Sequence, residues 1–277
     1  MKGTIIGDIV GSIYEHHNIR TKDFPLFSAV HPCRFTDDTV MTLAVARAMM
    51  ESLEDDEPLY DALVRNMQRF GKAYPHRGYG GRFKQWIREE DPRPYYSYGN
   101  GAAMRCSPAG WVCSDPEKAR ALARETTLPT HNHPESVKAA SLVAELICRA
   151  RQGASMEALR QIALSYYDIP DIDKLREWNY FDVSCQGTMP AALSAFFHST
   201  GFEDCIRNAI SVGGDSDTIA AIAGSIAEAY YGVPEEIWAE AETYLDDNMR
   251  RLVHDFYDFA RGLNEAPRAE NGTPDGK

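Results

Sequence analysis

The sequence predicts an all-α bundle, on three observations. Apolar residues recur every three or four positions over most of the chain, alternating β-branched patterns are scarce, and several periodic segments begin with helix-start signals. Residues 5–6 and 9–10 could pass for a strand, but Gly7, Asp8 and Gly11 interrupt that pattern. A chain of 277 residues fits one large domain better than two small ones. We therefore expect a single domain of packed helices.

Successive segments of the chain each carry their own helical signals. Asp115 precedes Pro116, which places a capping carboxylate before a proline at the first helical position. Glu235 and Glu236 follow a proline and put acids in a first turn. The glycine-rich stretch 77–81 is too short for a linker and is expected to be a loop between helices. The predicted helices cover residues 39–53, 59–74, 116–126, 134–151, 155–166, 188–198, 203–211, 218–231 and 235–263.

The two ends of the chain differ in composition. Residues 1–264 carry the periodic segments and are expected to form the domain. Residues 265–277 are polar and contain prolines and glycines, so they cannot bury enough apolar area to offset the entropy of ordering. We predict a disordered tail there.

Charge and hydropathy limit the environments that suit this chain. The formal net charge of −12 argues against nonspecific nucleic-acid binding, which needs Lys and Arg to replace phosphate counterions. No apolar run is long enough for a membrane span, and no basic stretch followed by an apolar core opens the chain. We expect a cytoplasmic protein that contacts neither nucleic acid nor membrane. Nothing in the sequence demands more than a monomer.

Cysteine usage gives no signal for a zinc site or a redox site. The chain has 6 cysteines, and no two of them form a Cys-x-x-Cys pair. A domain of this size does not need disulfides for stability, so we expect reduced and mostly buried thiols. The cysteines are Cys33, Cys106, Cys113, Cys148, Cys185 and Cys205.

Two acidic pairs stand directly before long apolar helices. Asp37 and Asp38 precede the first, and Asp215 and Asp217 precede the second, whose residues 219–227 are mostly small and apolar. That helix is expected to be buried all round, so unpaired carboxylates at its start would be unfavourable. Divalent cations remove the difficulty, since carboxylates suit Mg²⁺, Mn²⁺ or Ca²⁺ better than Zn²⁺. These aspartates could hold two metals for hydrolysis, although two solvated helix caps explain the acids alone equally well.

A third polar segment lies near the N-terminus. Asp8, Ser12 and Glu15 are spaced to share one face of a helix, and Gly7 and Gly11 leave a bare surface where another backbone can approach. For Asp8 we favour a structural role, as a cap or a hydrogen-bonding group in the core. Glu15, at the end of the stripe, is the better candidate for chemistry.

These motifs together resemble the ADP-ribosylglycohydrolase family, which includes the dinitrogenase reductase activating glycohydrolase and the ADP-ribosylarginine and ADP-ribosylserine hydrolases. The similarity rests on Gly7-Asp8-x-x-Gly11 with Glu15 and on three further segments, which occur in the family's order. Those segments are Thr36-Asp37-Asp38-Thr39, Gly99-Asn100-Gly101-Ala102-Ala103-Met104-Arg105 and Gly213-Gly214-Asp215-Ser216-Asp217-Thr218.

The resemblance implies an orthogonal all-α fold with a binuclear Mg²⁺ or Mn²⁺ centre in a cleft. Glu15, Asp38 and Asp215 are expected to be catalytic, with Glu15 managing proton transfer near the metals. The implied metal ligands are Thr36, Asp37, Asp38, Asp215, Asp217 and Thr218.

The same resemblance implies a binding loop for ADP-ribose at the glycine-rich segment. Backbone N–H groups there can face the diphosphate at close range. Residues 78–80 and 130–134 are expected to line the cleft as well, and Tyr98 could stack on adenine. The implied substrate-binding residues are Tyr98, Gly99, Asn100, Gly101, Met104, Arg105 and His131.

The function that follows is release of ADP-ribose from a modified protein or a small-molecule conjugate. An arginine-linked acceptor is favoured, because an acidic cleft suits a cationic guanidinium. Serine-linked or other O-linked acceptors, and a noncatalytic ADP-ribose-binding relative, remain alternatives. A metallophosphatase would need histidine ligands that are missing here. Its Gly-Asp-x-His-Gly motif is similar to residues 7–11, but Val10 occupies the position of the histidine. An Asp-x-Asp phosphotransferase would need a buried strand before Asp215, where the pattern is helical.

Overall fold

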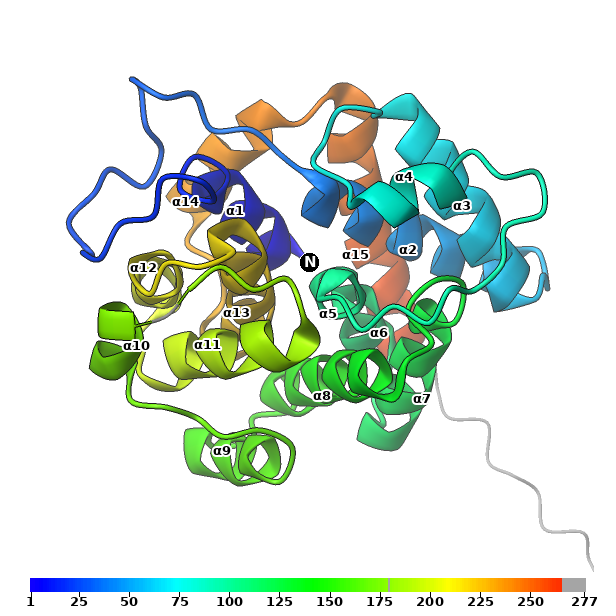
Figure 1. Ribbon diagram of the computed structural model, residues 1–277. Coiled ribbons are helices and arrows are strands. Elements are labelled where there is room, and N and C mark those ends of the chain that lie inside the picture. The colour runs from blue at the N-terminus through cyan, green and yellow to red at the C-terminus, as the bar shows by residue number, and fades with distance from the viewer. Residues whose placement is uncertain (179, 266–277) are drawn as a thin grey trace, which may run out of the picture.

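The computed structural model describes residues 1–178 and 180–265, and within these ranges it contains helices and no strands (Figure 1). A lone antiparallel bridge joins Gly99 to Ser184. The predicted all-α fold class is confirmed. The helices are α1 Lys2–Gly11, α2 Asp37–Glu54, α3 Leu59–Ala73, α4 Gly81–Trp86, α5 Gly101–Arg105, α6 Ser107–Val112, α7 Pro116–Thr127, α8 Pro134–Arg151, α9 Met156–Leu164, α10 Ile172–Trp178, α11 Cys185–Phe197, α12 Phe202–Ser211, α13 Ser216–Tyr231, α14 Glu235–Ala241, the 3-10 helix η1 Glu242–Tyr244 and α15 Asp247–Glu265.

Helices α1 and α13 form the centre of the molecule and pack backbone to backbone. A Cβ atom at Gly7 would lie 2.2 Å from the carbonyl oxygen of Ala220, and one at Gly11 would lie 2.4 Å from Cα of Asp217. No side chain fits in that space, so glycine is required for the two helices to approach this closely. The predicted bare surface beside Gly7 and Gly11 is therefore confirmed, as is the burial of α13 on all sides up to Glu228.

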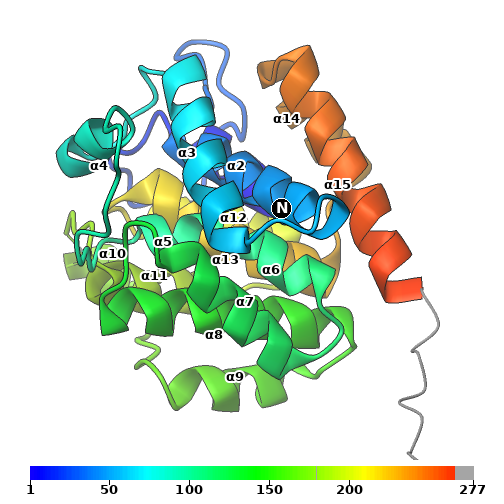
Figure 2. The ribbon, with the colours of Figure 1, turned by 90° about the vertical axis from the view of Figure 1, so that its right-hand side faces the viewer.

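The remaining helices surround this pair. Helices α2, α8, α11 and α12 contact α13, while α3 packs outside α2 and α7 outside α8. Figure 2 shows α9 at the lower edge of the molecule and α15 at the right-hand edge, and α15 contacts α2. Because α1 is antiparallel to α13, the end of α1 meets the beginnings of α13 and α2 at one place. That meeting point carries the acidic motifs.

Several predicted boundaries were wrong. Residues 235–263 do not form one helix, because Asp246 interrupts it and its side chain accepts hydrogen bonds from the backbone N–H groups of Asn248 and Met249, at 2.9 and 3.0 Å. The segment 99–105, expected as a loop, contains α5, and α4 begins at Gly81. Residues 5–10, which could have passed for a strand, lie in α1. The short helices α4, α5, α6 and α10 carry too few turns to show a period.

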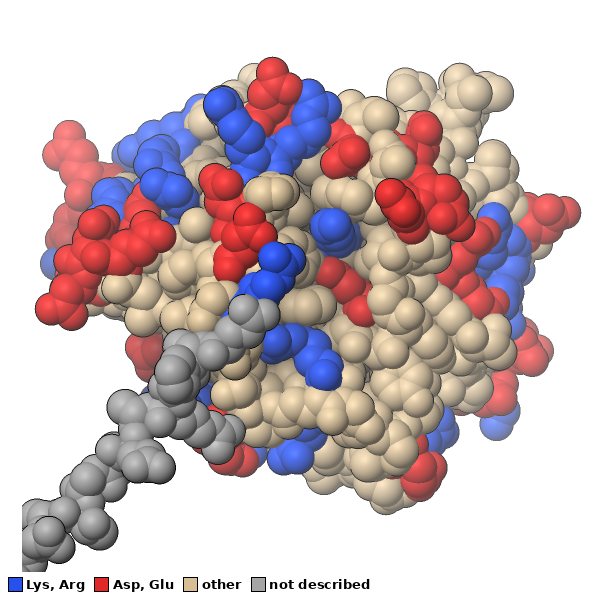
Figure 3. Space-filling view, turned by 180° about the vertical axis from the view of Figure 1, so that it is seen from behind, with Lys and Arg blue, Asp and Glu red and all other residues tan. Residues whose placement is uncertain are grey.

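Other expectations from the sequence concern the thiols, the tail and the surface. All six cysteines are free, and only Cys113 is partly exposed, as predicted. The predicted disordered tail lies outside the described residues, apart from the end of α15 at Glu265. Among the described helices, none combines the length and the hydropathy that a bilayer crossing requires. Acidic and basic side chains are interspersed on the face shown in Figure 3.

Candidate metal and substrate site

Asp8 connects α1 to the start of α2. Its carboxylate accepts hydrogen bonds from the backbone N–H groups of Thr36 and Thr39, at 2.8 and 3.0 Å. The hydroxyl groups of Thr36 and Thr39 also donate to it. These contacts satisfy free N–H groups at the helix start that no side chain within α2 caps. The structural role favoured for Asp8 is confirmed, and it brings Asp38 next to α1.

The acidic side chains from α1, α2 and α13 form two clusters that share one member. Carboxylate oxygens of Asp8, Asp38 and Asp217 lie within 4.8 Å of one another, and so do those of Glu15, Asp215 and Asp217. All except Glu15 are buried. Asp37 belongs to neither cluster, although it lines the same cleft. The acidic motifs, far apart in the sequence, are thus brought together with Asp217 between the two clusters.

Burial makes these carboxylates difficult to ionise without a counter-charge. Loss of hydration, and then the neighbouring carboxylates, raise the pKa of Asp38 and Asp217 well above the ordinary value. The same causes, burial first, raise the pKa of Asp37 to about 8. Burial also raises the pKa of Asp215 to about 6, despite a hydrogen bond from Asn100 that lowers it.

The donor set fits hard divalent cations. Oδ1 of Asp38 is buried and has no hydrogen-bond partner, while its Oδ2 accepts from the hydroxyl of Thr218 at 3.2 Å. An oxygen atom left free in this way is available as a ligand. Every candidate ligand is a carboxylate or a hydroxyl, which suits Mg²⁺ or Mn²⁺. These acidic groups could therefore hold metal.

Glu15 reaches the clusters from a turn after α1 rather than from a helix. Helix α1 ends at Gly11, so the predicted helical stripe stops short of Glu15. The amide of Asn18 holds the turn: Nδ2 donates to the carbonyls of Tyr14 and Gly214 at 2.7 and 2.9 Å, and Oδ1 accepts from the Gly214 N–H at 2.8 Å. The Ser216 hydroxyl donates to the Tyr14 carbonyl at 3.2 Å. Asn18 was not among the predicted residues, because no local pattern in the sequence distinguishes it.

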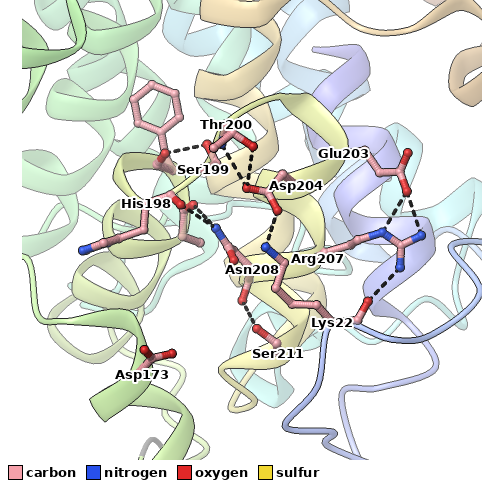
Figure 4. A network of polar contacts seen from close by, with 12 residues as sticks. Lys22, Asp173, His198, Ser199, Thr200, Glu203, Asp204, Arg207, Asn208 and Ser211 are labelled. Atoms are coloured by element: carbon pink, nitrogen blue, oxygen red, sulfur yellow. Dashed lines mark hydrogen bonds and ion pairs between the residues drawn. The ribbon is translucent and has the colours of Figure 1, made fainter.

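The rest of this long loop is fixed to α12 (Figure 4). Lys22 forms an ion pair with Asp204. Arg207 donates to the carbonyls of Lys22 and Phe24 at 2.9 and 2.7 Å, and Glu203 orients its guanidinium through an ion pair at 2.7 Å. These contacts anchor the loop between α1 and α2, and so restrict where Glu15 can lie.

A cleft of about 360 Å³ opens over the clusters. Of the predicted catalytic, metal-binding and substrate-binding residues, only Tyr98 does not line it: its side chain is 57% exposed and its ring packs edge-on against His133. Of the two further segments expected to line the cleft, 78–80 contributes Gly78 and Gly80, whereas 130–134 contributes only His131. The assignment of Tyr98 to substrate therefore stays a prediction without support from the cleft. The predicted residues that line the cleft are Glu15, Thr36, Asp37, Asp38, Gly99, Asn100, Gly101, Met104, Arg105, His131, Asp215, Asp217 and Thr218.

Asn100 connects the glycine-rich segment to the carboxylates. Its Nδ2 donates to Oδ2 of Asp215 at 2.6 Å and to Oγ1 of Thr188 at 3.0 Å. Its backbone N–H donates to the carbonyl of Val183 at 2.8 Å, next to the Gly99–Ser184 bridge. Asn100 therefore orients a candidate metal ligand in addition to lining the cleft.

Arginines that sequence analysis did not select form part of the cleft wall. Arg34, Arg77 and Arg82 line it together with Arg105. The guanidinium of Arg77 lies 3.8 Å from the ring centroid of Phe35, and that of Arg82 lies 4.8 Å from the ring of Tyr95. The cleft is thus lined by both carboxylates and guanidinium groups. A ligand that carries both an anionic group and hydroxyl groups would match this distribution.

Characterised proteins resemble this chain over most of its length. The family model described as ADP-ribosylglycohydrolase matches residues 1–266. ADP-ribosyl-[dinitrogen reductase] glycohydrolase from Rhodospirillum rubrum is 28% identical, over 80% of this chain and 78% of that protein. ADP-ribosylarginine hydrolase Tri1 from Pseudomonas putida is 28% identical, over 95% of this chain and 78% of that protein.

A vertebrate protein and a solved structure are similar to the same degree. ADP-ribosylhydrolase ARH3 from Gallus gallus is 25% identical, over 93% of this chain and 92% of that protein. The solved structure of an ADP-ribosylglycohydrolase-related protein complex is 26% identical with a TM-score of 0.69, covering 93% of this chain and 95% of its own.

Proposed function

Because this chain belongs to the ADP-ribosylglycohydrolase family and is a glycohydrolase, we propose that it cleaves the bond between ADP-ribose and a modified arginine. The acceptor is a protein or a small-molecule conjugate. One relative supports this choice by name, the ADP-ribosylarginine hydrolase from Pseudomonas putida. The ADP-ribosyl-[dinitrogen reductase] glycohydrolase supports a protein as the acceptor.

The pair of carboxylate clusters sharing Asp217 is the observation that carries the proposal. Two acidic groups that share one carboxylate could hold a pair of divalent cations, and Mg²⁺ or Mn²⁺ fits oxygen ligands alone. Such cations would act as Lewis acids and lower the pKa of a water molecule for attack on the anomeric carbon. The residues proposed to hold them are Thr36, Asp37, Asp38, Asp215, Asp217 and Thr218.

The chain's own side chains divide the remaining tasks by position. Glu15 is the cluster member that solvent reaches, so it can exchange protons with the nucleophile or the leaving group. Asp38 and Asp215 place negative charge beside the reacting carbon, which becomes positive as the glycosidic bond breaks. Asn100 keeps Asp215 in position.

Substrate charge favours an arginine acceptor over a serine acceptor. A guanidinium is cationic and is attracted by the carboxylate of Glu15, which is not among the proposed metal ligands, whereas a serine hydroxyl gains nothing from it. The diphosphate of ADP-ribose would be repelled by Glu15, but Arg34, Arg77 and Arg82, which also line the cleft, supply the opposite charge. The kcat/KM for an arginine-linked substrate should therefore fall as ionic strength rises, while kcat changes little.

A hydrolysis panel tests the proposal. Purified protein is assayed with peptides carrying ADP-ribose on arginine, on serine, and on aspartate or glutamate, with Mg²⁺, with Mn²⁺ and after chelation. We expect the fastest release from arginine and complete loss of activity on chelation. Faster release from serine would refute the arginine assignment alone. Full activity after exhaustive chelation would refute the metal centre.

A further inference from the structure

A buried chain of hydrogen bonds runs from Arg105 through Thr130 to His131 at the cleft wall. Arg105 is 1% exposed, and its Nη2 donates to the Thr126 carbonyl at 3.0 Å and to Oγ1 of Thr130 at 2.8 Å. Oγ1 of Thr130 lies 2.7 Å from Nδ1 of His131. Thr130 is 0% exposed, so water does not compete for its hydroxyl group.

The chemistry of Arg105 sets the direction of this chain. A guanidinium has only donors, so Oγ1 of Thr130 accepts from it and keeps its own proton for one acceptor. Within the described part of the chain, the structure offers that proton no acceptor other than Nδ1 of His131. A buried hydroxyl group with no acceptor is unfavourable. Nδ1 is therefore the acceptor, and the ring proton is on Nε2.

The ring of His131 is neutral and its position is restricted. Burial, and then the charge of Arg105, lower the pKa of His131 well below its ordinary value. The ring of Tyr95 packs against it with a centroid separation of 5.9 Å. Nε2 faces the glycine-rich segment: a Cβ atom would lie 3.0 Å from it at Gly101 and 3.5 Å at Gly99.

We propose that Thr130, oriented by Arg105, is a positioning residue that fixes His131 as a neutral Nε2–H donor for an oxygen atom of ADP-ribose. The identity of the ligand rests on the proposed function, whereas the position of the proton is a property of the protein alone. A neutral donor binds phosphate or ribose oxygens with a strength that is constant through neutral pH, because the ring does not titrate there.

Nitrogen-15 NMR of histidine-labelled protein tests the proton position directly. His131→Gln assigns the two ring signals by their loss. We expect Nδ1 at the shift of a hydrogen-bonded acceptor, Nε2 at that of a protonated nitrogen, and no titration between pH 5.5 and 8. A proton on Nδ1, or titration of the ring within that range, would overturn the proposal whether or not the protein hydrolyses any conjugate.

Substitutions at Thr130 test its role in ligand binding, with free ADP-ribose as the calorimetric probe. Thr130→Val should raise the Kd about tenfold, the scale of one lost hydrogen bond, and move the Nδ1 signal toward that of an unpaired nitrogen. Thr130→Ser keeps the hydroxyl group and should leave both the Kd and the Nδ1 signal at their wild-type values. Thr127→Val removes a neighbouring buried hydroxyl that donates only to the Arg124 carbonyl, and should change neither. An unchanged Kd for Thr130→Val, or equal increases for Thr130→Val and Thr127→Val, would overturn the proposal.

Discussion

After divalent cations are removed, the free energy of unfolding should fall as pH rises. Carboxylates paired with cationic side chains usually give the opposite dependence, in which stability is lost as pH falls. Burial and the charge of Asp8 raise the pKa of Asp37 to about 8, far above the value of about 3.9 in an unfolded chain. The folded state then binds more protons than the unfolded state. The stabilisation is complete below about pH 4 and is lost as pH rises toward 8.

The structure limits the size of this effect. One carboxyl group with so large a shift changes the free energy of unfolding by about 1.4 kcal/mol per pH unit between the two pKa values. Because solvent reaches part of the Asp37 side chain, we expect about 1–2 kcal/mol between pH 6 and 8. For a protein of this length that corresponds to a fall in Tm of roughly 2–4 °C.

Thermal unfolding of chelated protein at several pH values measures this pH dependence of the Tm. Asp37→Asn is the matched control, since it keeps the shape of the side chain but does not titrate, and its Tm should depend less on pH. With saturating Mg²⁺ the wild-type Tm should no longer fall, because metal binding requires ionised carboxylates. A chelated wild-type Tm that is flat or rises from pH 6 to 8, or that runs parallel to Asp37→Asn, would refute the reasoning.

Four further outcomes are expected at the cleft. Asp217→Ala should abolish hydrolysis and lower the metal content found by elemental analysis, because both clusters lose a member. Thr36→Val removes only a neutral hydroxyl and should lower activity and metal content less. Full turnover with full metal content in Asp217→Ala would contradict the binuclear centre. Glu15→Gln should bind ADP-ribose in calorimetry but turn over about 10²-fold more slowly, the usual scale for a lost general acid or base; a near-normal rate would make Glu15 structural. Asn18→Ala should lower kcat at least about tenfold in steady-state assays with an unchanged Kd for ADP-ribose, because it frees the turn that carries Glu15. Gly101→Ala should raise that Kd about tenfold, because its Cβ would lie 3.0 Å from Nε2 of His131 and would displace the ring or the glycine-rich segment. An unchanged Kd would contradict a need for this close approach in ADP-ribose binding.

Asp38, Asp215 and Asp217 could be selected from the sequence because their signal is local. Each lies at the start of a helix, as its N-cap or in its first turn, and the composition of α13 indicates a buried start. Unusual carboxylates are therefore visible in a few consecutive residues. Gly7 and Gly11 are equally local, since a glycine repeated at helical spacing predicts a close backbone contact. The helices of three or more turns were found for the same reason, because a period needs several turns to appear.

The break at Asp246 was not visible in the same way. The apolar period continues from 235 to 263, and the interruption depends on a side chain that caps a new helix.

The sequence by itself determined the all-α class, the acidic motifs and the glycines that let α1 approach α13, since each depends on neighbouring residues or on one helical period. Only the tertiary structure decided that Asp8 caps α2, that Asn18 holds the turn of Glu15 against Gly214, and that Arg34, Arg77 and Arg82 share one cleft wall. These contacts join positions far apart in the chain. The conformational preferences of neighbouring residues do not specify the distance between two such segments, because that distance is set by how the helices between them pack.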